Sequence, residues 1–281
     1  MKVKLYITSK KHRVDFIGDY ASTLKANFDV VGDLCDADIL LVLGIWDPAA
    51  SRWARRARKM GVPYVVIPLG DLSAWNTRTP IVRRTAQTLL FANPLVRHAQ
   101  GLVATNQAEK KRLDDIRWNR HVTLITDYLF SSATTLEAMV AEYLSMADKT
   151  LADYDAKTRK RIWSRVEDIA QNHDDTPEKT LLFQLLLVRN RMPHKNIPPD
   201  ELEKTYNLLM ADNYDEDLLN HLVHRARLDA FAASLWQVLG QRHALGEGFM
   251  PSPPKKGRLA QKIASYVKPR PTLTHRGQAI G

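Results

Sequence analysis

Three carboxylates lie where short apolar segments of the sequence end. Asp71, Glu109 and Asp127 each stand at the end of such a segment or just after it. If these segments are parallel strands, their carboxyl ends share one edge of a sheet, where open α/β sheets bind their ligands. The three side chains are therefore candidates for polar contacts with a ligand. The alternative is that each carboxylate only caps the helix that follows it.

A metal site is the second kind of chemistry that the residues could support. His221 and His224 are three residues apart on a predicted helix, and Asp217 lies one turn earlier. Zinc needs a further well-placed ligand, and HLVH lacks the glutamate of the HExxH motif. We therefore expect a solvated or partly packed histidine pair and no metal. The sequence contains no Ser-His-Asp order, P-loop or GxGxxG motif, and we expect no cofactor.

The net charge of +10 is distributed unevenly along the chain. Residues 1–130 hold 20 basic and 12 acidic side chains, residues 131–249 hold 14 and 19, and residues 250–281 hold seven and none. This division indicates three parts in three different environments.

Basic side chains gather on the predicted helix 51–61 and near the C-terminus. A solvated face, a patch for anionic lipid and a site for a phosphate-bearing acceptor all remain open. Nucleic acid is not expected, because the basic residues are not interleaved with exposed aromatic residues. The candidate residues of this membrane or anion patch are Arg52, Arg55, Arg56, Arg58, Lys59, Lys255, Lys256, Arg258 and Lys262.

The C-terminal basic segment also contains a short amphipathic stretch. Leu259, Ile263, Tyr266 and Val267 fall on one face of the predicted helix, and basic side chains flank them. Such a helix is suited to a membrane interface. It could equally dock on the protein's own acidic helical region, and the sequence leaves both alternatives open.

The elements that would position these residues follow a strand–helix alternation. Most of the apolar segments are continuous rather than alternating, as in strands buried on both faces. Helical stretches of crossover length separate them, which predicts an α/β, Rossmann-like parallel sheet over residues 1–132. The predicted strands are 3–9, 28–32, 37–44, 63–70, 101–106 and 121–127, and the predicted helices are 13–26, 48–60, 79–98 and 106–116.

From about residue 133 no further strand is predicted. Residues 133–246 indicate an all-α region, and residues 247–281 indicate a mobile, proline-containing basic tail with one short helix. The expected helices of the all-α region are 134–147, 148–171, 177–190, 199–211 and 215–242. The N-terminus is unlike a secretory signal, and no apolar run reaches the length of a membrane span. We expect a cytoplasmic protein, with a peripheral position on the inner face of the membrane as an alternative.

Residues 30–130 resemble the N-terminal, acceptor-side half of family 4 glycosyltransferases of the GT-B fold. GVPYVVIPLG (61–70) is similar to the GVPYVVSPHG of that family, and a tryptophan follows each; AQGLVATNQAE (99–109) is similar to AD.IIATSEAE. Gly44 and Trp46 match the glycine and aromatic residue that end an earlier strand. The candidate acceptor- or ligand-binding residues are Ser9, Lys10, Gly44, Trp46, Gly70, Asp71, Trp75, Asn106, Glu109 and Asp127.

The departures from the family pattern narrow what this resemblance implies. Leu69 stands where the family carries a histidine, SKKH (9–12) replaces a glycine-rich loop, and Asp127–Tyr128 replaces Asn-Gly. The family binds its nucleotide-sugar in a second Rossmann domain with two glutamates eight positions apart. No glutamate from residue 137 onward has another glutamate eight residues later. The resemblance therefore implies a chain that has the acceptor-side domain without the donor-side domain.

Three hypotheses about function follow, and no catalytic residue is assigned in any of them. In the first, the protein is a glycosyltransferase-like accessory or acceptor-binding subunit of cell-surface polysaccharide synthesis. In the second, it is an active hexosyltransferase, with an unusual site or one completed by a partner chain. In the third, it is a scaffold whose acidic helical region binds another protein. The expected partners are a glycosyltransferase subunit, a second copy of the chain, or an anionic membrane surface, and we take the first hypothesis as the prediction.

Overall fold

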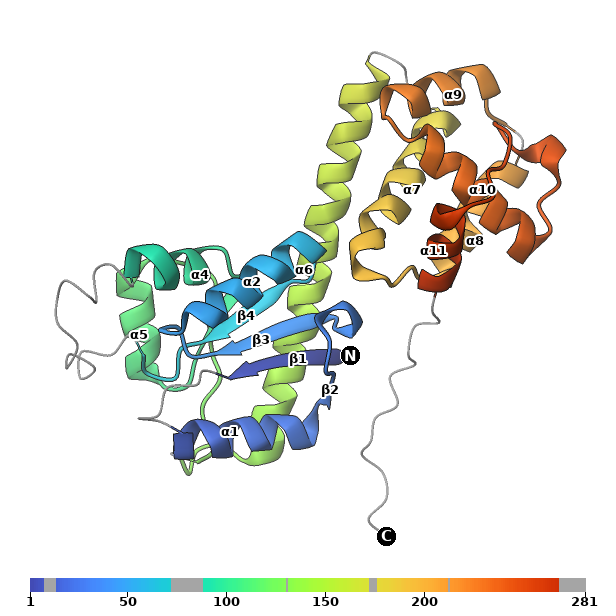
Figure 1. The fold of residues 1–281 in the computed structure, drawn as a ribbon. Coiled ribbons are helices and arrows are strands. Elements are labelled where there is room, and N and C mark those ends of the chain that lie inside the picture. Colours follow the sequence, from blue (N-terminus) through green and yellow to red (C-terminus); the bar gives the residue numbers. More distant parts are fainter. Residues whose placement is uncertain (8–13, 72–87, 130, 172–175, 212, 268–281) are drawn as a thin grey trace, which may run out of the picture. The chain divides into compact units, whose positions relative to one another are not determined.

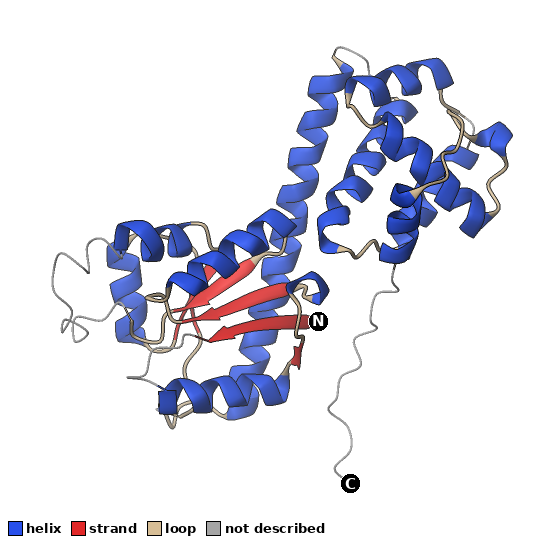
Figure 2. Cartoon of the chain, viewed as in Figure 1, coloured by secondary structure: helices blue, strands red, loops and turns tan. Residues whose placement is uncertain are grey.

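The described part of the chain forms two compact units (Figures 1 and 2). The computed structural model describes residues 1–7, 14–71, 88–129, 131–171, 176–211 and 213–267. The first unit is Met1–Asp155 and the second is Ala156–Gly281. The division between them falls inside helix α6 (Leu136–Ala170), whereas the change from strands to helices lies earlier, before α6 begins.

The first unit is built on a sheet of six parallel strands in the order β2-β1-β3-β4-β5-β6. Each strand overlaps one of the six predicted segments, and the α/β class with a parallel sheet is confirmed. The strands are β1 (Lys2–Ile7), β2 (Asp29–Val30), β3 (Ile39–Leu43), β4 (Tyr64–Ile67), β5 (Gly101–Ala104) and β6 (Val122–Leu124). The chain first moves from β1 to β2 on one side and then to β3 on the other, so the strand order reverses between β1 and β3.

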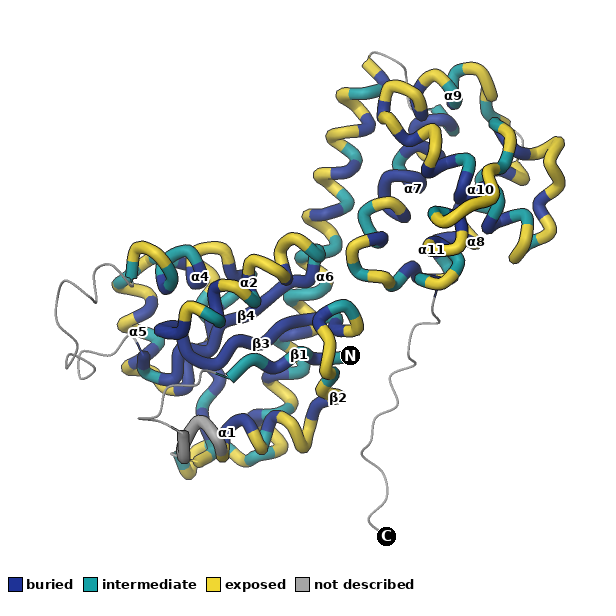
Figure 3. The backbone as a smooth tube through the Cα atoms, viewed as in Figure 1, coloured by how far each residue is buried: buried dark blue, intermediate teal, exposed yellow. Residues whose placement is uncertain are grey.

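Helices cover both faces of this sheet, because consecutive strand residues point to opposite faces. Leu40 and Val42 of β3 pack with helices α2, α4 and α5, while Leu41 and Leu43 pack with α1 and α6. Strands β3 and β4 are buried along their whole length (Figure 3). This burial explains why their sequences are continuously apolar. The bounds of the remaining elements in this unit are α1 (Val14–Asn27), η2 (Leu34–Asp36), α2 (Pro48–Met60), η4 (Thr88–Ala92), α4 (Asn93–Arg97) and α5 (Gln107–Ile116).

The ends of α2 are set by residues that can be identified in the sequence. The Asp47 side chain accepts a hydrogen bond from the backbone N–H of Ala49, and Pro48 occupies the first turn, where its missing N–H is not needed. Gly61 ends the helix at a φ of 74°, a left-handed conformation that glycine adopts without steric cost. The predicted helix 48–60 is therefore found with the predicted end.

Two expected helix boundaries differ from the structure. The predicted helices 134–147 and 148–171 are one continuous 35-residue helix, α6, because no glycine or proline interrupts the sequence between them. The single helix predicted over 215–242 is instead two, α9 (Glu216–Arg225) and α10 (Asp229–His243). Arg227, at a φ of 56°, makes the left-handed turn that separates them.

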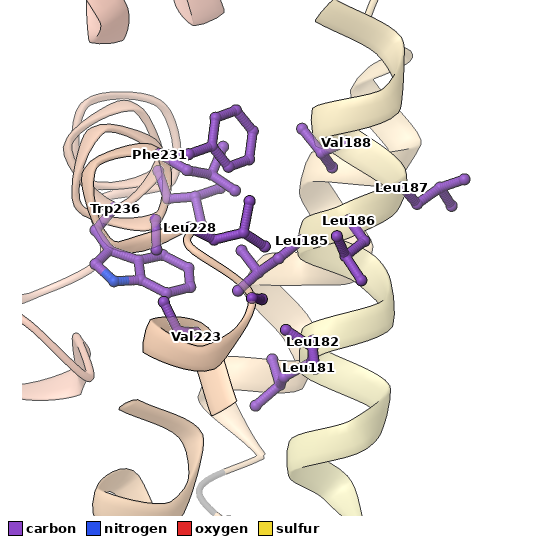
Figure 4. Packing of buried hydrophobic residues seen from close by; sticks show 14 of the residues in the cluster. Leu181, Leu182, Leu185, Leu186, Leu187, Val188, Val223, Leu228, Phe231 and Trp236 are labelled. Carbon is purple, nitrogen blue, oxygen red and sulfur yellow. The ribbon is translucent and has the colours of Figure 1, made fainter. Parts of the chain in front are cut away.

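The second unit has an all-helical core to which the C-terminal part of α6 contributes. Leu181, Leu182 and Leu185 of α7 lie toward Val223 and Trp236 in the packed interior (Figure 4). The Trp236 indole N–H donates to the Ser252 hydroxyl at 3.1 Å, so the polar atom of this buried ring is satisfied. The other elements of this unit are α7 (Pro177–Arg191), η5 (Met192–His194), α8 (Pro199–Met210), η6 (Glu247–Phe249) and α11 (Arg258–Tyr266).

The predicted tail is part of this core up to residue 267. Ile263 of α11 is fully buried, and Ala260 and Val267 are buried with it. Val267 forms a parallel bridge with Ile197, and the backbone N–H of Lys255 donates to the carbonyl of Ala233 at 2.8 Å. The expectation of a mobile tail was therefore wrong for residues 250–267. Of the two alternatives for the amphipathic helix, the structure shows the docked one, because burying this face against apolar neighbours is favourable.

Candidate functional site

The carboxyl edge of the sheet gathers the predicted ligand-binding residues that the structure describes. Because all six strands are parallel, the loops that follow β3, β4, β5 and β6 start from the same edge. These loops contain Gly44, Trp46, Gly70, Asp71, Asn106 and Asp127, and Glu109 lies in the first turn of α5 directly after one of them. Hydrogen bonds link the four loops to one another, so these residues form one connected group. The other three candidates, Ser9, Lys10 and Trp75, lie outside the described residues.

Asp71 joins the loops after β3 and β4. Its buried carboxylate accepts a hydrogen bond from the backbone N–H of Ile45 at 2.8 Å, and its backbone carbonyl accepts one from the Trp46 indole N–H at 2.8 Å. Gly44 precedes this contact at a φ of 85°, a conformation that favours glycine. The described contacts of Asp71 therefore hold the two loops together.

Glu109 joins the loops after β4 and β5. One of its carboxylate oxygens accepts from the backbone N–H of Gly70, and the other accepts from the N–H and hydroxyl of Thr105 at 2.8 and 2.9 Å. Asn106 caps helix α5 by accepting from the backbone N–H of Glu109 at 2.9 Å. Asn106 is therefore the cap of α5, whereas Glu109 lies inside α5 and links the two loops rather than capping a helix that follows it.

The turn before Gly70 contains an unusual residue for its conformation. Leu69, where the resembling family has a histidine, is at a φ of 51°, and Gly70 follows at 75°. A non-glycine residue in this left-handed region costs about 1 kcal/mol or more. The Gly70–Glu109 hydrogen bond fixes the turn that holds Leu69 in this state.

Asp127 differs from the other two carboxylates because half of its hydrogen-bonding capacity is unused. Its side chain is buried, and one oxygen, Oδ1, accepts from the backbone N–H of Leu129 at 2.9 Å. The other oxygen, Oδ2, has no hydrogen-bond partner among the residues that the structure describes. Burial raises the pKa of this carboxyl group, although the hydrogen bond from Leu129 acts in the opposite direction. Asp127 is therefore the carboxylate at this edge that can accept a further donor.

Two tyrosines that the sequence analysis did not assign to the site lie near these carboxylates. The hydroxyls of Tyr20 in α1 and Tyr143 in α6 are hydrogen-bonded to each other, and both side chains are buried. Burial raises the pKa of each phenol, and the negative charges of Asp127 and Glu109 raise it further. Both tyrosines stay protonated at neutral pH. The sequence contains one signal for them, since each is a hydroxyl-bearing residue on an otherwise apolar helix face.

The predicted basic residues fall into two groups on different units. Arg52, Arg55, Arg56, Arg58 and Lys59 are all exposed on α2. Arg56 lies 3.8 Å from the Asp33 carboxylate and stacks over the ring of Trp53. Lys255, Lys256, Arg258 and Lys262 are exposed on the second unit. The membrane role of the α11 apolar face is corrected here, because Ile263 and Val267 pack inside that unit. Anion binding by the two basic groups stays a prediction.

The histidine pair shows no ligand set around it. His221 and His224 are exposed, and the His224 Nδ1 lies 3.0 Å from the Asp229 carboxylate. Within the described ranges, no group of three or more His, Cys, Asp or Glu side chains is placed to hold a metal ion. In the same part of the chain, no helix is both long and apolar enough to span a membrane.

Comparison with known proteins gave no match to any family model, curated protein or solved structure. The resemblance to glycosyltransferases stays a prediction from the motifs at residues 61–70 and 99–109.

Proposed function

We propose that this protein is a glycosyltransferase-like subunit that binds a glycan acceptor at the carboxyl edge of its sheet, without a nucleotide-sugar site of its own. The observation that supports this most directly is the unpaired, buried Oδ2 of Asp127. A buried carboxylate oxygen without a donor costs free energy, and a ligand hydroxyl would supply that donor.

The chemistry of this edge suits a polyhydroxylated ligand. Sugar hydroxyls both donate and accept hydrogen bonds, so they can pair with either protonation state of Asp127. The raised pKa of this carboxyl group makes its neutral form, which can also donate, easier to reach. Because Oδ2 is covered in this conformation, the residues around Asp127 have to rearrange to admit the ligand.

The arrangement of the rest of the chain supports an accessory role over a complete enzyme. After β6, the described residues form helices, and the only strand-like pairing among them is the isolated bridge between Ile197 and Val267. The resembling family needs a second parallel sheet for its donor. Asp71 and Glu109, the two other candidate carboxylates of the edge, accept from backbone N–H groups, which favours a binding role over acid–base chemistry.

The test is a thermal-shift and calorimetry series on the full chain with soluble oligosaccharides and with UDP- and GDP-sugars. A ligand at 100 times its Kd stabilises the fold by ~2.7 kcal/mol, which such measurements resolve. We expect at least one oligosaccharide to bind saturably and the nucleotide-sugars to produce no shift. Asp127→Ala should abolish oligosaccharide binding, while Asp115→Ala, at an exposed position on α5, should leave it unchanged.

Two outcomes would contradict this proposal in different ways. Saturable binding of a nucleotide-sugar would restore the alternative of a self-sufficient glycosyltransferase. If no oligosaccharide in a broad panel bound, or if the two variants bound it equally, the glycan site at Asp127 would be wrong.

A further inference from the structure

A pocket on the outer helical layer of the first unit is separate from the Asp127 region. Helices α2 and α4 and the π-helical turn η4 lie against one another over one face of the sheet (Figure 1). Between them is a pocket of about 220 Å³. Its lining includes Ser51, Arg55 and Arg58 from α2, Leu90 from η4, Pro94 from α4, and His98.

The polar side of this pocket is cationic. Arg55 and Arg58 are three residues apart on α2, so their side chains project from the same face of the helix. His98 faces them from the end of α4, and no carboxylate is among the described residues that line the pocket. Burial and the positive charges of Arg58 and Arg97 lower the pKa of His98. The part of this shift that comes from the two arginines reflects a positive local potential, which attracts an anion.

The other side of the pocket is apolar. The Tyr64 ring and Leu95 form the inner wall, where the Tyr64 hydroxyl donates to the Leu95 carbonyl at 2.8 Å and is thus satisfied within the protein. Leu90 lies at the rim with 65% of its surface exposed, and the neighbouring Leu89 is exposed to 67%. Large apolar side chains beside a cationic pocket indicate a ligand with an anionic end and a hydrocarbon part.

We propose that this pocket binds a phosphate ester of an apolar alcohol. The phosphate lies between Arg55 and Arg58, whose guanidinium groups match its oxygens geometrically, and accepts a further hydrogen bond from the His98 ring. The hydrocarbon lies along Leu90 and Pro94. At about 220 Å³ the pocket has room for the phosphate and the first part of the chain. A free phosphate and the phosphate of a lipid share this chemistry, and the apolar wall distinguishes between them.

Calorimetry on the full chain with three probes tests the proposal. The probes are inorganic phosphate, monohexyl phosphate and 1-hexanol. We expect monohexyl phosphate to bind most tightly, inorganic phosphate at least about tenfold more weakly, which is ~1.4 kcal/mol, and hexanol not measurably. Equal affinity for the two phosphates would mean that the pocket recognises only the phosphate group. It would contradict the proposal that the ligand is a phosphate ester of an apolar alcohol. The absence of binding by either phosphate would overturn the site itself.

Matched variants on the same two elements show whether the pocket, rather than the general charge of α2, is responsible. Arg55→Gln with Arg58→Gln should weaken monohexyl phosphate at least about tenfold. Arg52→Gln with Lys59→Gln removes the same charge from exposed positions outside the lining and should change the affinity by less than about threefold. Equal losses in both double variants would indicate non-specific attraction and contradict the proposal.

A second matched pair tests the apolar side. Leu90→Ser should remove most of the preference for monohexyl over inorganic phosphate, whereas Leu89→Ser, outside the lining, should keep it. Both leucines are exposed, so neither change disturbs the core, and a thermal melt of each variant checks this. An unchanged preference in Leu90→Ser would contradict the placement of the hydrocarbon. Asp127→Ala should leave phosphate binding intact, which separates this inference from the proposed glycan site.

Discussion

The hydroxyl of Tyr20 is hydrogen-bonded to the hydroxyl of Tyr143, although 123 residues separate them in the chain. Tyr20 lies on α1 and Tyr143 on α6, the two helices that cover one face of the sheet. Both rings are fully buried, and they meet edge to face. The pair is therefore a polar link inside an apolar layer, where the loss of one partner leaves the other without water to replace it.

Removing both hydroxyls of this pair should cost less than the sum of the two single removals. Tyr20→Phe and Tyr143→Phe are each expected to lower the free energy of unfolding by about 1–3 kcal/mol, since each leaves a buried hydroxyl with a lost partner. The double variant should cost clearly less than the sum. Urea denaturation of the three variants measures the coupling. Additive losses would show that the two hydroxyls do not depend on each other.

Asp127→Asn should change how stability depends on pH. The folded state raises the pKa of this carboxyl group above its ordinary value of 3.8, so it binds more protons than the unfolded chain as pH rises past that value. Its contribution to stability is therefore fully present below pH 3.8 and is lost as pH rises through the raised pKa. Asparagine keeps the acceptor for Leu129 and cannot ionise. The stability of the variant relative to the wild type should thus increase from acid toward neutral pH.

Denaturation curves at several pH values, from acid to neutral, measure this difference. Asp115→Asn removes the same charge from an exposed position and serves as the control. A relative stability of Asp127→Asn that stays constant over the range would contradict the linkage, whatever its absolute value.

Glu109→Ala should destabilise the first unit strongly. The change leaves the backbone N–H groups of Gly70 and Thr105 without the acceptor that they share, and we expect a loss of about 3 kcal/mol. Asp114→Ala, on the same helix, removes an exposed carboxylate paired with Lys110 at 2.8 Å and should cost less than about 0.5 kcal/mol. Similar losses in both variants, measured by chemical denaturation, would show that Glu109 is not the link between the two loops.

Ile263→Ala tests whether α11 belongs to the core of the second unit. Because this side chain is fully buried, its truncation should cost about 2–4 kcal/mol, while Lys262→Ala at the exposed neighbouring position should stay within about 0.5 kcal/mol. Guanidinium denaturation followed by tryptophan fluorescence suits this unit, since Trp236 lies in the same cluster. If Ile263→Ala left the free energy of unfolding unchanged, α11 would not be part of this core, and the apolar face of Ile263 and Val267 could bind a different surface.

The strands could be predicted from the sequence because strands buried on both faces consist almost entirely of apolar residues. Residues 39–43 and 64–67 have apolar side chains on both faces of a buried sheet, and this gives continuous runs that few other structures explain. The end of α2 could also be predicted, because Gly61 adopts the left-handed conformation that ends a helix without steric cost. The break between α9 and α10 could not be predicted, because it depends on a positive φ at Arg227, which arginine rarely adopts.

The common position of the candidate carboxylates could be predicted from the sequence, but their individual contacts could not. That Asp71, Glu109 and Asp127 share an edge follows from the parallel sheet alone. Their different roles depend on partners far away in the chain, such as Ile45 for Asp71 and Gly70 for Glu109. A hydrophobic pattern carries no information about which backbone N–H a side chain reaches. The pocket between α2 and α4 was only partly indicated, because the sequence placed Arg55 and Arg58 in a basic patch but could not show that His98 lines the same pocket.

The packing of α11 determines the order in which the two units can be completed during synthesis. All six strands, and the part of α6 that packs on them, have emerged by residue 155, so the first unit can fold while the ribosome is still translating the rest. The second unit needs Ile263 and Val267, and Val267 bridges back to Ile197. The core of the second unit is therefore complete only after α11 has been synthesised, whereas the first unit needs no residue beyond 155.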